Sequence, residues 1–219
     1  MAFWNNIPKV TRNLLFINII MFVATWISED FMIRTFAMFF PASPLFRPWQ
    51  ILTHMFMHGG FWHLFFNMYS LWMFGSLIER QIGEKKFITF YFLCGLGAAA
   101  LHTGVEYLSA TSMLASGNNS AYTELLYTPV LGASGAIYGL LIGFAMIYPD
   151  ARLTLIFPPI TLGVKWWVGI FIAIELFTGI TGTAMGIAHF AHLGGALFGF
   201  LLMLYWKKSH RLWEKDKWF

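Results

Sequence analysis

Six long apolar segments constrain the fold of this chain more than any other feature of its sequence. They cover about 13–28, 61–79, 87–108, 131–148, 166–183 and 187–206. Each is long enough, or nearly long enough, to cross a hydrocarbon core of about 30 Å as a helix. A helix also satisfies its own backbone hydrogen bonds in lipid. The sequence therefore predicts an all-α polytopic membrane protein with six transmembrane helices.

Composition supports a membrane protein and bounds its domains. Of the 219 residues, 58% are hydrophobic and 11% are charged, whereas a soluble domain has about 25% charged residues. Since no polar stretch could form a soluble module, we expect one six-helix membrane domain, 1–206, and a short basic cytoplasmic tail, 207–219. The first span lacks a small-residue cleavage site after it, so it is expected to be retained. The single cysteine, Cys94, excludes a disulfide framework.

Basic residues predict the orientation of these helices. With the N-terminus in the cytoplasm, twelve lysines and arginines lie inside, and only Arg34 and Arg47 lie outside. The twelve are Lys9, Arg12, Arg80, Lys85, Lys86, Arg152, Lys165, Lys207, Lys208, Arg211, Lys215 and Lys217. This asymmetry follows the positive-inside rule and predicts an N-in/C-in topology. The net charge of +4 is thereby explained without a nucleic acid partner. The Phe-, Met- and Pro-rich first loop, about 29–60, is expected to be partly submerged in the membrane.

Four polar side chains fall at a similar depth on three of the predicted helices. Spans two, four and six run in one direction, so depth can be counted from their cytoplasmic ends at about 1.5 Å per residue. Ser134 and His192 come out about 21 Å above the inner boundary. His63 and Asn67, which share one face of span two, come out at about 24 Å and 18 Å. Polar groups at membrane depth are expensive and are therefore candidates for function.

Small residues predict that spans four and six pack closely. Glycines recur every four residues in both spans, at Gly135, Gly139, Gly143, Gly195 and Gly199. This spacing lets membrane helices approach backbone to backbone. Because Ser134 and His192 begin these stripes, we expect the hydroxyl to reach the imidazole, as an activated nucleophile requires.

Three motifs then resemble those of the rhomboid family of intramembrane serine proteases. They are HMFMHGGFWHLFFN at 54–67, GASGAIYG at 132–139 and AHLGGALFG at 191–199. The motifs occur in the family's order, and the resemblance covers about 45–205. One departure is Trp49-Gln50, where many members carry Trp-Arg.

The resemblance implies a rhomboid-like fold and a serine–histidine dyad without an acid. Ser134 would be the nucleophile and His192 its base, with His63, Asn67 and the Ser134 backbone N–H as the oxyanion hole. Tyr138 would pack against the His192 ring, and Gly132 belongs to the serine motif. Span five and the cap loop before span six would admit substrate. The expected partners are the lipid bilayer and transmembrane proteins with helix-destabilising residues, and the expected location is the bacterial cytoplasmic membrane.

A metal site is the first alternative, because His54 and His58 could join His63 and His192. Zinc sites combine histidines with an acid, but HExxH is absent, and spans two, four and six have no acid at the shared depth. We therefore expect no metal and no cofactor, and we expect His58 to hydrogen-bond loop backbone or ordered water.

Glu175, near the middle of span five, raises the second alternative. An intramembrane acid is typical of transporters, so a polytopic transporter or a helix-binding chaperone that uses Glu175 and the histidines stays open. The favoured interpretation is a neutral or hydrogen-bonded glutamate that holds span five in place. His189, three residues before His192, is interpreted as a residue of the cap loop.

Overall fold

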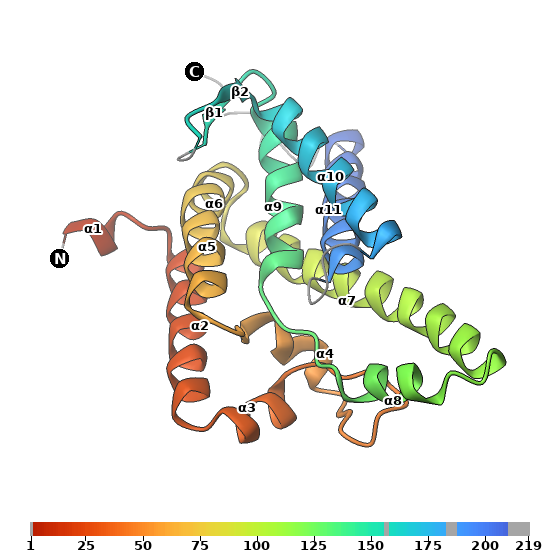
Figure 1. The fold of residues 1–219 in the computed structure, drawn as a ribbon. Coiled ribbons are helices and arrows are strands. Elements are labelled where there is room, and N and C mark those ends of the chain that lie inside the picture. The colour runs from red at the N-terminus through yellow and green to blue at the C-terminus, as the bar shows by residue number, and fades with distance from the viewer. Residues whose placement is uncertain (1, 156–157, 183–187, 210–219) are drawn as a thin grey trace.

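The structure is a computed structural model, and it describes residues 2–155, 158–182 and 188–209. Helices make up most of this part of the chain (Figure 1). In chain order the elements are α1 (Ala2–Asn5), α2 (Lys9–Ile27), α3 (Glu29–Phe36), α4 (Gln50–Thr53), η1 (His54–Phe56), α5 (Phe61–Ser70), η2 (Leu71–Gly75), α6 (Ser76–Ile82), α7 (Glu84–Ala115), α8 (Asn119–Tyr127), α9 (Ser134–Ile147), β1 (Arg152–Thr154), β2 (Thr161–Gly163), α10 (Val164–Thr181) and α11 (His189–Lys208).

The all-α architecture is confirmed, since a helix lies on each of the six predicted apolar segments. Among the described residues, four helices are long and apolar enough to cross a membrane by themselves: α2, α7, α10 and α11. The fifth, α9, is a shorter apolar helix of 14 residues. The remaining segment, which is the second in chain order, consists of α5, the π-helical turn η2 and α6. These follow one another without a break in helical backbone angles.

Two features of the connections go beyond the sequence-based prediction. Helix α7 continues to Ala115, well past the predicted end near 108, and α8 follows it in the polar stretch before α9. The connection from α9 to α10 contains an antiparallel hairpin in which Leu153 pairs with Leu162. The predicted tail lies mostly outside the described residues, because α11 ends at Lys208 and nothing after Ser209 is described.

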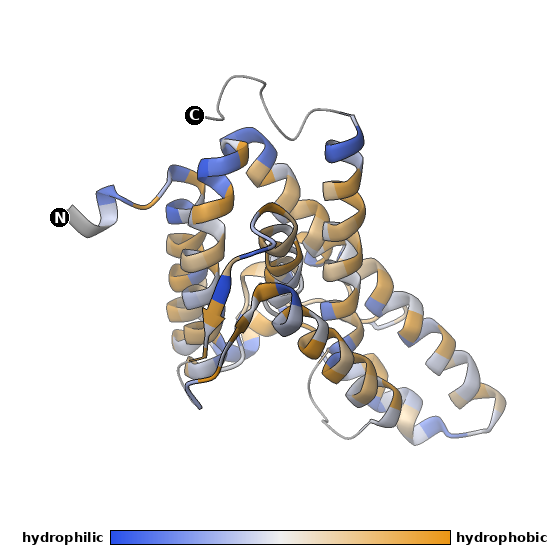
Figure 2. Cartoon of the chain, turned by 90° about the horizontal axis from the view of Figure 1, so that it is seen from above, coloured by the Kyte–Doolittle hydropathy of each residue, from blue (hydrophilic) through white to orange (hydrophobic). Residues whose placement is uncertain are grey.

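The outer surface of the helix bundle is apolar. Large side chains such as Ile20, Trp26, Phe177 and Ile180 are all more than 60% exposed. Figure 2 shows hydrophobic residues along the length of the long helices and hydrophilic residues gathered at their ends. A soluble protein rarely exposes apolar patches of this extent, so this surface fits a protein that is solvated by lipid.

Helices α7, α9 and α11 form the centre of the bundle, and glycines bring α9 and α11 together. A Cβ atom added to Gly195 would lie 1.8 Å from the carbonyl oxygen of Gly135, and one added to Gly199 would lie 2.8 Å from the Cα of Gly139. The predicted close packing of these two helices is therefore confirmed. Gly143 differs, because it faces Phe90 of α7 instead of α11.

A buried carboxylate fixes the start of α2 against α6. Glu79, only 3% exposed, accepts hydrogen bonds from the backbone N–H groups of Val10 and Thr11 at 2.9 and 2.7 Å and from the Thr11 hydroxyl at 2.7 Å. These N–H groups belong to the first turn of α2, where no intrahelical partner exists, and a negative charge there also favours the helix dipole.

The first loop folds around Gln50, the residue at which the chain departs from the family pattern. Its buried side-chain amide donates to the carbonyl groups of Arg34 and Leu45, and its amide oxygen accepts from the N–H of Arg47. The indole of the neighbouring Trp49 donates to the carbonyl of Thr35. A neutral amide thus cross-links α3 to the loop that precedes α4.

Candidate active site

Ser134 is the first residue of α9, and Gly132 shapes the turn that leads into it. Gly132 has a φ of +133°, a backbone conformation that glycine adopts far more readily than other residues. Its N–H donates to the carbonyl of His54 at 2.9 Å, which ties the serine motif to the first histidine motif. The N–H groups in the first turn of a helix lack intrahelical partners, so this end of α9 offers donors and a partial positive charge next to the Ser134 hydroxyl.

The Ser134 hydroxyl meets the imidazole of His192 across the α9–α11 contact. Ser134 Oγ lies 2.8 Å from His192 Nε2, within hydrogen-bonding distance. One turn along α9, the Tyr138 ring stacks on the imidazole with centroids 4.5 Å apart and planes 8° apart. This pair of side chains has the geometry of a nucleophile beside its base.

His63 of α5 approaches the same turn, and Asn67 follows it one helical turn later on α5. A Cβ atom added to Gly132 would lie 2.9 Å from His63 Nε2 and 3.5 Å from Ser134 Oγ, so the imidazole edge lies close beside the serine. The amide nitrogen of Asn67 is buried and has no hydrogen-bond partner among the described residues. Buried donors are normally paired, so this unpaired amide is available to a ligand oxygen.

The His58 ring packs against the ring of His63. The two rings meet edge to face with centroids 5.0 Å apart, and within the described chain neither ring nitrogen of His58 has a hydrogen-bond partner. The expected hydrogen bond of His58 to loop backbone or ordered water stays a prediction, and the ring contact to His63 is an additional one. Burial, followed by the proximity of His63, lowers the pKa of His58 to about 3, so this loop histidine is uncharged at neutral pH.

Glu175 of α10 also belongs to this site. Its Oε1 accepts a hydrogen bond from the Tyr138 hydroxyl and lies 2.8 Å from Nδ1 of His192. Its Oε2 lies 2.6 Å from Nδ1 of His189. Reading His189 as a cap-loop residue was therefore wrong: it opens α11 and shares a carboxylate with His192, because residues three apart lie on neighbouring positions of one helical face.

A signal for this arrangement was present in the sequence. Helices α10 and α11 are consecutive and pack against each other, so residues at similar distances from their connection lie at similar heights. Glu175 lies about two turns before the end of α10 and His192 about one turn after the start of α11. The expected position of Glu175 near the middle of span five concealed this proximity.

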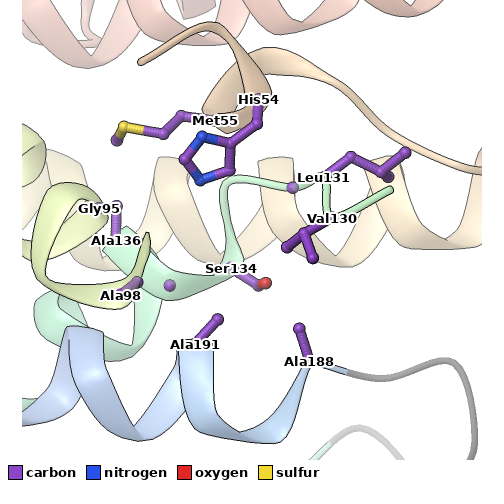
Figure 3. Close-up of a pocket in the computed structure, with 12 residues that line it drawn as sticks. His54, Met55, Gly95, Ala98, Val130, Leu131, Ser134, Ala136, Ala188 and Ala191 are labelled. Carbon is purple, nitrogen blue, oxygen red and sulfur yellow. The ribbon is translucent and has the colours of Figure 1, made fainter. Parts of the chain in front are cut away.

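A small cavity adjoins the serine. It measures about 20 Å³ and is lined mainly by small or apolar residues, together with His54 and Ser134. Figure 3 shows Ser134 between the Val130–Leu131 segment and the side chains of Ala188 and Ala191. A cavity of this size has room for about one water molecule. The cap-loop residues 183–187, which the sequence associates with substrate entry, lie outside the described residues.

The histidines outside this cluster do not converge with it on a metal geometry. His54 Nδ1 lies 3.0 Å from the carbonyl oxygen of Gln50. Throughout residues 2–155, 158–182 and 188–209, no three His, Cys, Asp or Glu side chains form a group that could hold a metal ion.

Comparison with known proteins gives one consistent result. Residues 46–209 match the family model of the rhomboid domain. The chain is 30% identical over 220 residues to the mitochondrial presenilin-associated rhomboid-like protein of Bos taurus, across 98% of this chain and 53% of that protein. It is 28% identical to the mitochondrial Rhomboid protein 1 of Saccharomyces cerevisiae, across 78% of this chain and 47% of that protein. It is also 29% identical to the rhomboid protease AarA of Providencia stuartii, across 71% of this chain and 55% of that protein. The chain thus spans about half the length of the curated relatives it matches.

Proposed function

Because this chain belongs to the rhomboid family, we propose that it is an intramembrane serine endopeptidase that cleaves membrane-anchored proteins with Ser134 and His192. The observation that carries the proposal is the 2.8 Å contact between Ser134 Oγ and His192 Nε2. That contact joins the second and third family motifs, and the first motif supplies His63 beside it. The name of the similar AarA protein, a rhomboid protease, supports the same activity.

The proposed reaction is an acyl transfer followed by hydrolysis. As the bond from Ser134 Oγ to the scissile carbonyl carbon forms, the hydroxyl proton moves to Nε2 of His192. The same proton then passes to the amide nitrogen as the C–N bond breaks and the amine leaves. A water molecule next gives a proton to His192 and attacks the acyl-enzyme, and the proton returns to Ser134 as the carboxylic acid is released.

Three donors are proposed to stabilise the oxyanion of the tetrahedral intermediate. They are the His63 ring nitrogen beside the Gly132 turn, the unpaired amide of Asn67 one helical turn later on α5, and the backbone N–H of Ser134. Preorganised donors of this kind each contribute about 10²–10³ in kcat. His58, which packs against His63, would keep that ring in place.

Six membrane crossings, N-in/C-in, form the proposed topology. They are α2, the α5–α6 segment, α7, α9, α10 and α11. Helix α9 has 14 residues and is about 21 Å long, so Ser134 at its outer end would lie below the outer surface of a core of about 30 Å. Substrates whose helices unwind easily at that depth would fit this site. We propose the bacterial cytoplasmic membrane as the location; two of the similar relatives are named as mitochondrial.

Labelling with a serine-directed probe tests the proposal. A fluorophosphonate should label Ser134 in membranes that contain the wild-type chain, and both Ser134→Ala and His192→Ala should abolish labelling while the protein stays folded in detergent. A chelator such as EDTA should leave labelling unchanged, because the proposed chemistry uses no metal. Equal labelling of wild type and Ser134→Ala would reject the mechanism and leave a non-cutting chaperone or a transporter.

A further inference from the structure

Glu175 is the one intramembrane acid that reaches the Ser134–His192 pair in the described part of the chain. Its side chain is buried, with 7% of the residue exposed. Both carboxylate oxygens are used: Oε1 by the Tyr138 hydroxyl and His192 Nδ1, and Oε2 by His189 Nδ1. The acid on α10 is thereby connected to α9 and to the first turn of α11.

The two nitrogens of His192 have different partners, and this difference fixes the tautomer. Nε2 faces Ser134 Oγ and Nδ1 faces Glu175 Oε1, each at 2.8 Å. A carboxylate only accepts hydrogen bonds, so Nδ1 must carry the hydrogen. Nε2 is then left with a free lone pair, which is the state that can take the serine proton.

Tyr138 and Glu175 restrain the imidazole in complementary ways. The stacked Tyr138 ring, parallel to within 8°, fixes the plane of the imidazole but not which edge faces the serine. The carboxylate fixes that edge, because only Nδ1 directed at Glu175 leaves Nε2 directed at Ser134. A negative charge at this distance also stabilises the imidazolium that forms as the serine proton is transferred.

We propose that Glu175 is the positioning residue of the Ser134–His192 pair, so that the site works with an acid behind the histidine instead of with two residues alone. The inference rests on the proposed function. Glu175 takes up no proton in any step: the proton moves only between Ser134 Oγ, His192 Nε2 and the leaving nitrogen. His189 holds the second oxygen of the carboxylate and so orients the first toward His192.

The groups that face this cluster come from several elements. Ser134 and Tyr138 lie on α9, His189 on α11 beside His192, and Thr178 on α10, where its hydroxyl lies 3.1 Å from His189 Nδ1. His63 approaches the Gly132 turn from α5. A test must therefore separate the orientation of His192 from a general loosening of α10 against α11.

Steady-state kinetics of the full chain in liposomes, with a transmembrane substrate, provide that test. In Glu175→Gln, kcat should fall about 10²–10⁴-fold, the loss expected when an orienting carboxylate becomes an amide, and KM should stay within about two-fold of wild type. Glu175→Asp keeps the charge, and its kcat should be at least about ten-fold higher than that of Glu175→Gln. Glu106→Gln is the matched control, because Glu106 is also an intramembrane acid beside a histidine, 3.2 Å from His102. It should leave both constants unchanged.

His189→Gln keeps the inference testable if Glu175→Gln does not fold. This variant removes the imidazole contacts to Oε2 and to the Thr178 hydroxyl but leaves Oε1 on His192, so kcat should stay within about ten-fold of wild type. The inference is overturned if folded Glu175→Gln keeps its kcat, if Glu175→Asp is no better than Glu175→Gln, or if His189→Gln alone loses about 10²-fold or more in kcat, the loss assigned to Glu175. An inactive wild-type chain, or one whose activity survives Ser134→Ala, would instead overturn the proposed function.

Discussion

Gly132 combines a φ of +133° with a position beside the Nε2–Cε1 edge of the His63 ring. An added methyl group would approach His63 Nε2 to 2.9 Å, a contact that real Cβ atoms rarely make. Both constraints follow from the turn that presents Ser134 at the start of α9. At the scale of single residues, the site therefore depends on glycine at position 132, which has no side chain, as much as on its polar residues.

Gly132→Ala should reduce both stability and catalysis. The strained backbone should cost about 1–3 kcal/mol, measured as a lower free energy of unfolding in detergent. Displacement of an oxyanion donor should lower kcat by at least about ten-fold, toward the 10²–10³ seen when such a donor is lost. Gly104→Ala in α7 is the control, because nothing lies within 4 Å of its added methyl group. Equal behaviour of the two variants would show that the Gly132 turn does not shape the site.

At the scale of helices, the approach of α9 to α11 allows Ser134 and His192 to meet. Gly135, one residue after Ser134, is in backbone contact with Gly195, which lies three residues after His192. The close approach is a property of both helices, so a change on either one should separate the pair even though it touches neither functional side chain.

Gly195→Ala should therefore separate the two helices and inactivate the site. The added methyl group would lie 1.8 Å from the Gly135 carbonyl oxygen, and overpacking of this kind costs about 1–3 kcal/mol. Thermal unfolding in detergent should shift downward, and the rate of fluorophosphonate labelling at Ser134 should fall. Gly169→Ala on α10, with nothing within 4 Å, should change neither. Unchanged labelling of Gly195→Ala would contradict the role given to this contact.

Glu79→Gln should weaken the attachment of α2 without altering the chemistry. The amide replaces a carboxylate that accepts three hydrogen bonds at the start of α2, so the free energy of unfolding should fall by about 1–3 kcal/mol. The kcat of the folded fraction should stay at the wild-type value. Glu124→Gln on the exposed α8 serves as the control and should leave stability unchanged. A loss of kcat in fully folded Glu79→Gln would show that α2 acts on the active site.

At the scale of the whole molecule, the N-in/C-in topology can be tested with single cysteines. Cys94 is buried, so a Cys94→Ala background accepts one cysteine at a time at the exposed positions Asn5 and Ser116. In intact cells a membrane-impermeant maleimide should label Ser116→Cys, whereas Asn5→Cys should react only after lysis. Labelling of Asn5→Cys in intact cells would reverse the proposed orientation.

Hydrophobic length and glycine spacing were sufficient to predict the helical segments and the α9–α11 contact, because the bilayer imposes both. The sequence also predicted one layer for Ser134, His192, His63 and Asn67; in the structure Ser134 contacts His192, and His63 lies beside the Gly132 turn. Glu175 was missed as a neighbour of His192, because its expected position near the middle of the span concealed that both residues lie within about two turns of the α10–α11 connection. The α9–α10 hairpin was missed as well, since it lies outside the apolar periodicity.

Cleavage of a transmembrane substrate in liposomes, compared between wild type and Ser134→Ala, tests the central claim most directly. The wild-type chain should cut the substrate within its membrane segment on the Ser134 side of the bilayer. Ser134→Ala, purified and folded to the same extent, should give no cleaved product. The same product at the same rate from both proteins would contradict the account of Ser134 as the nucleophile.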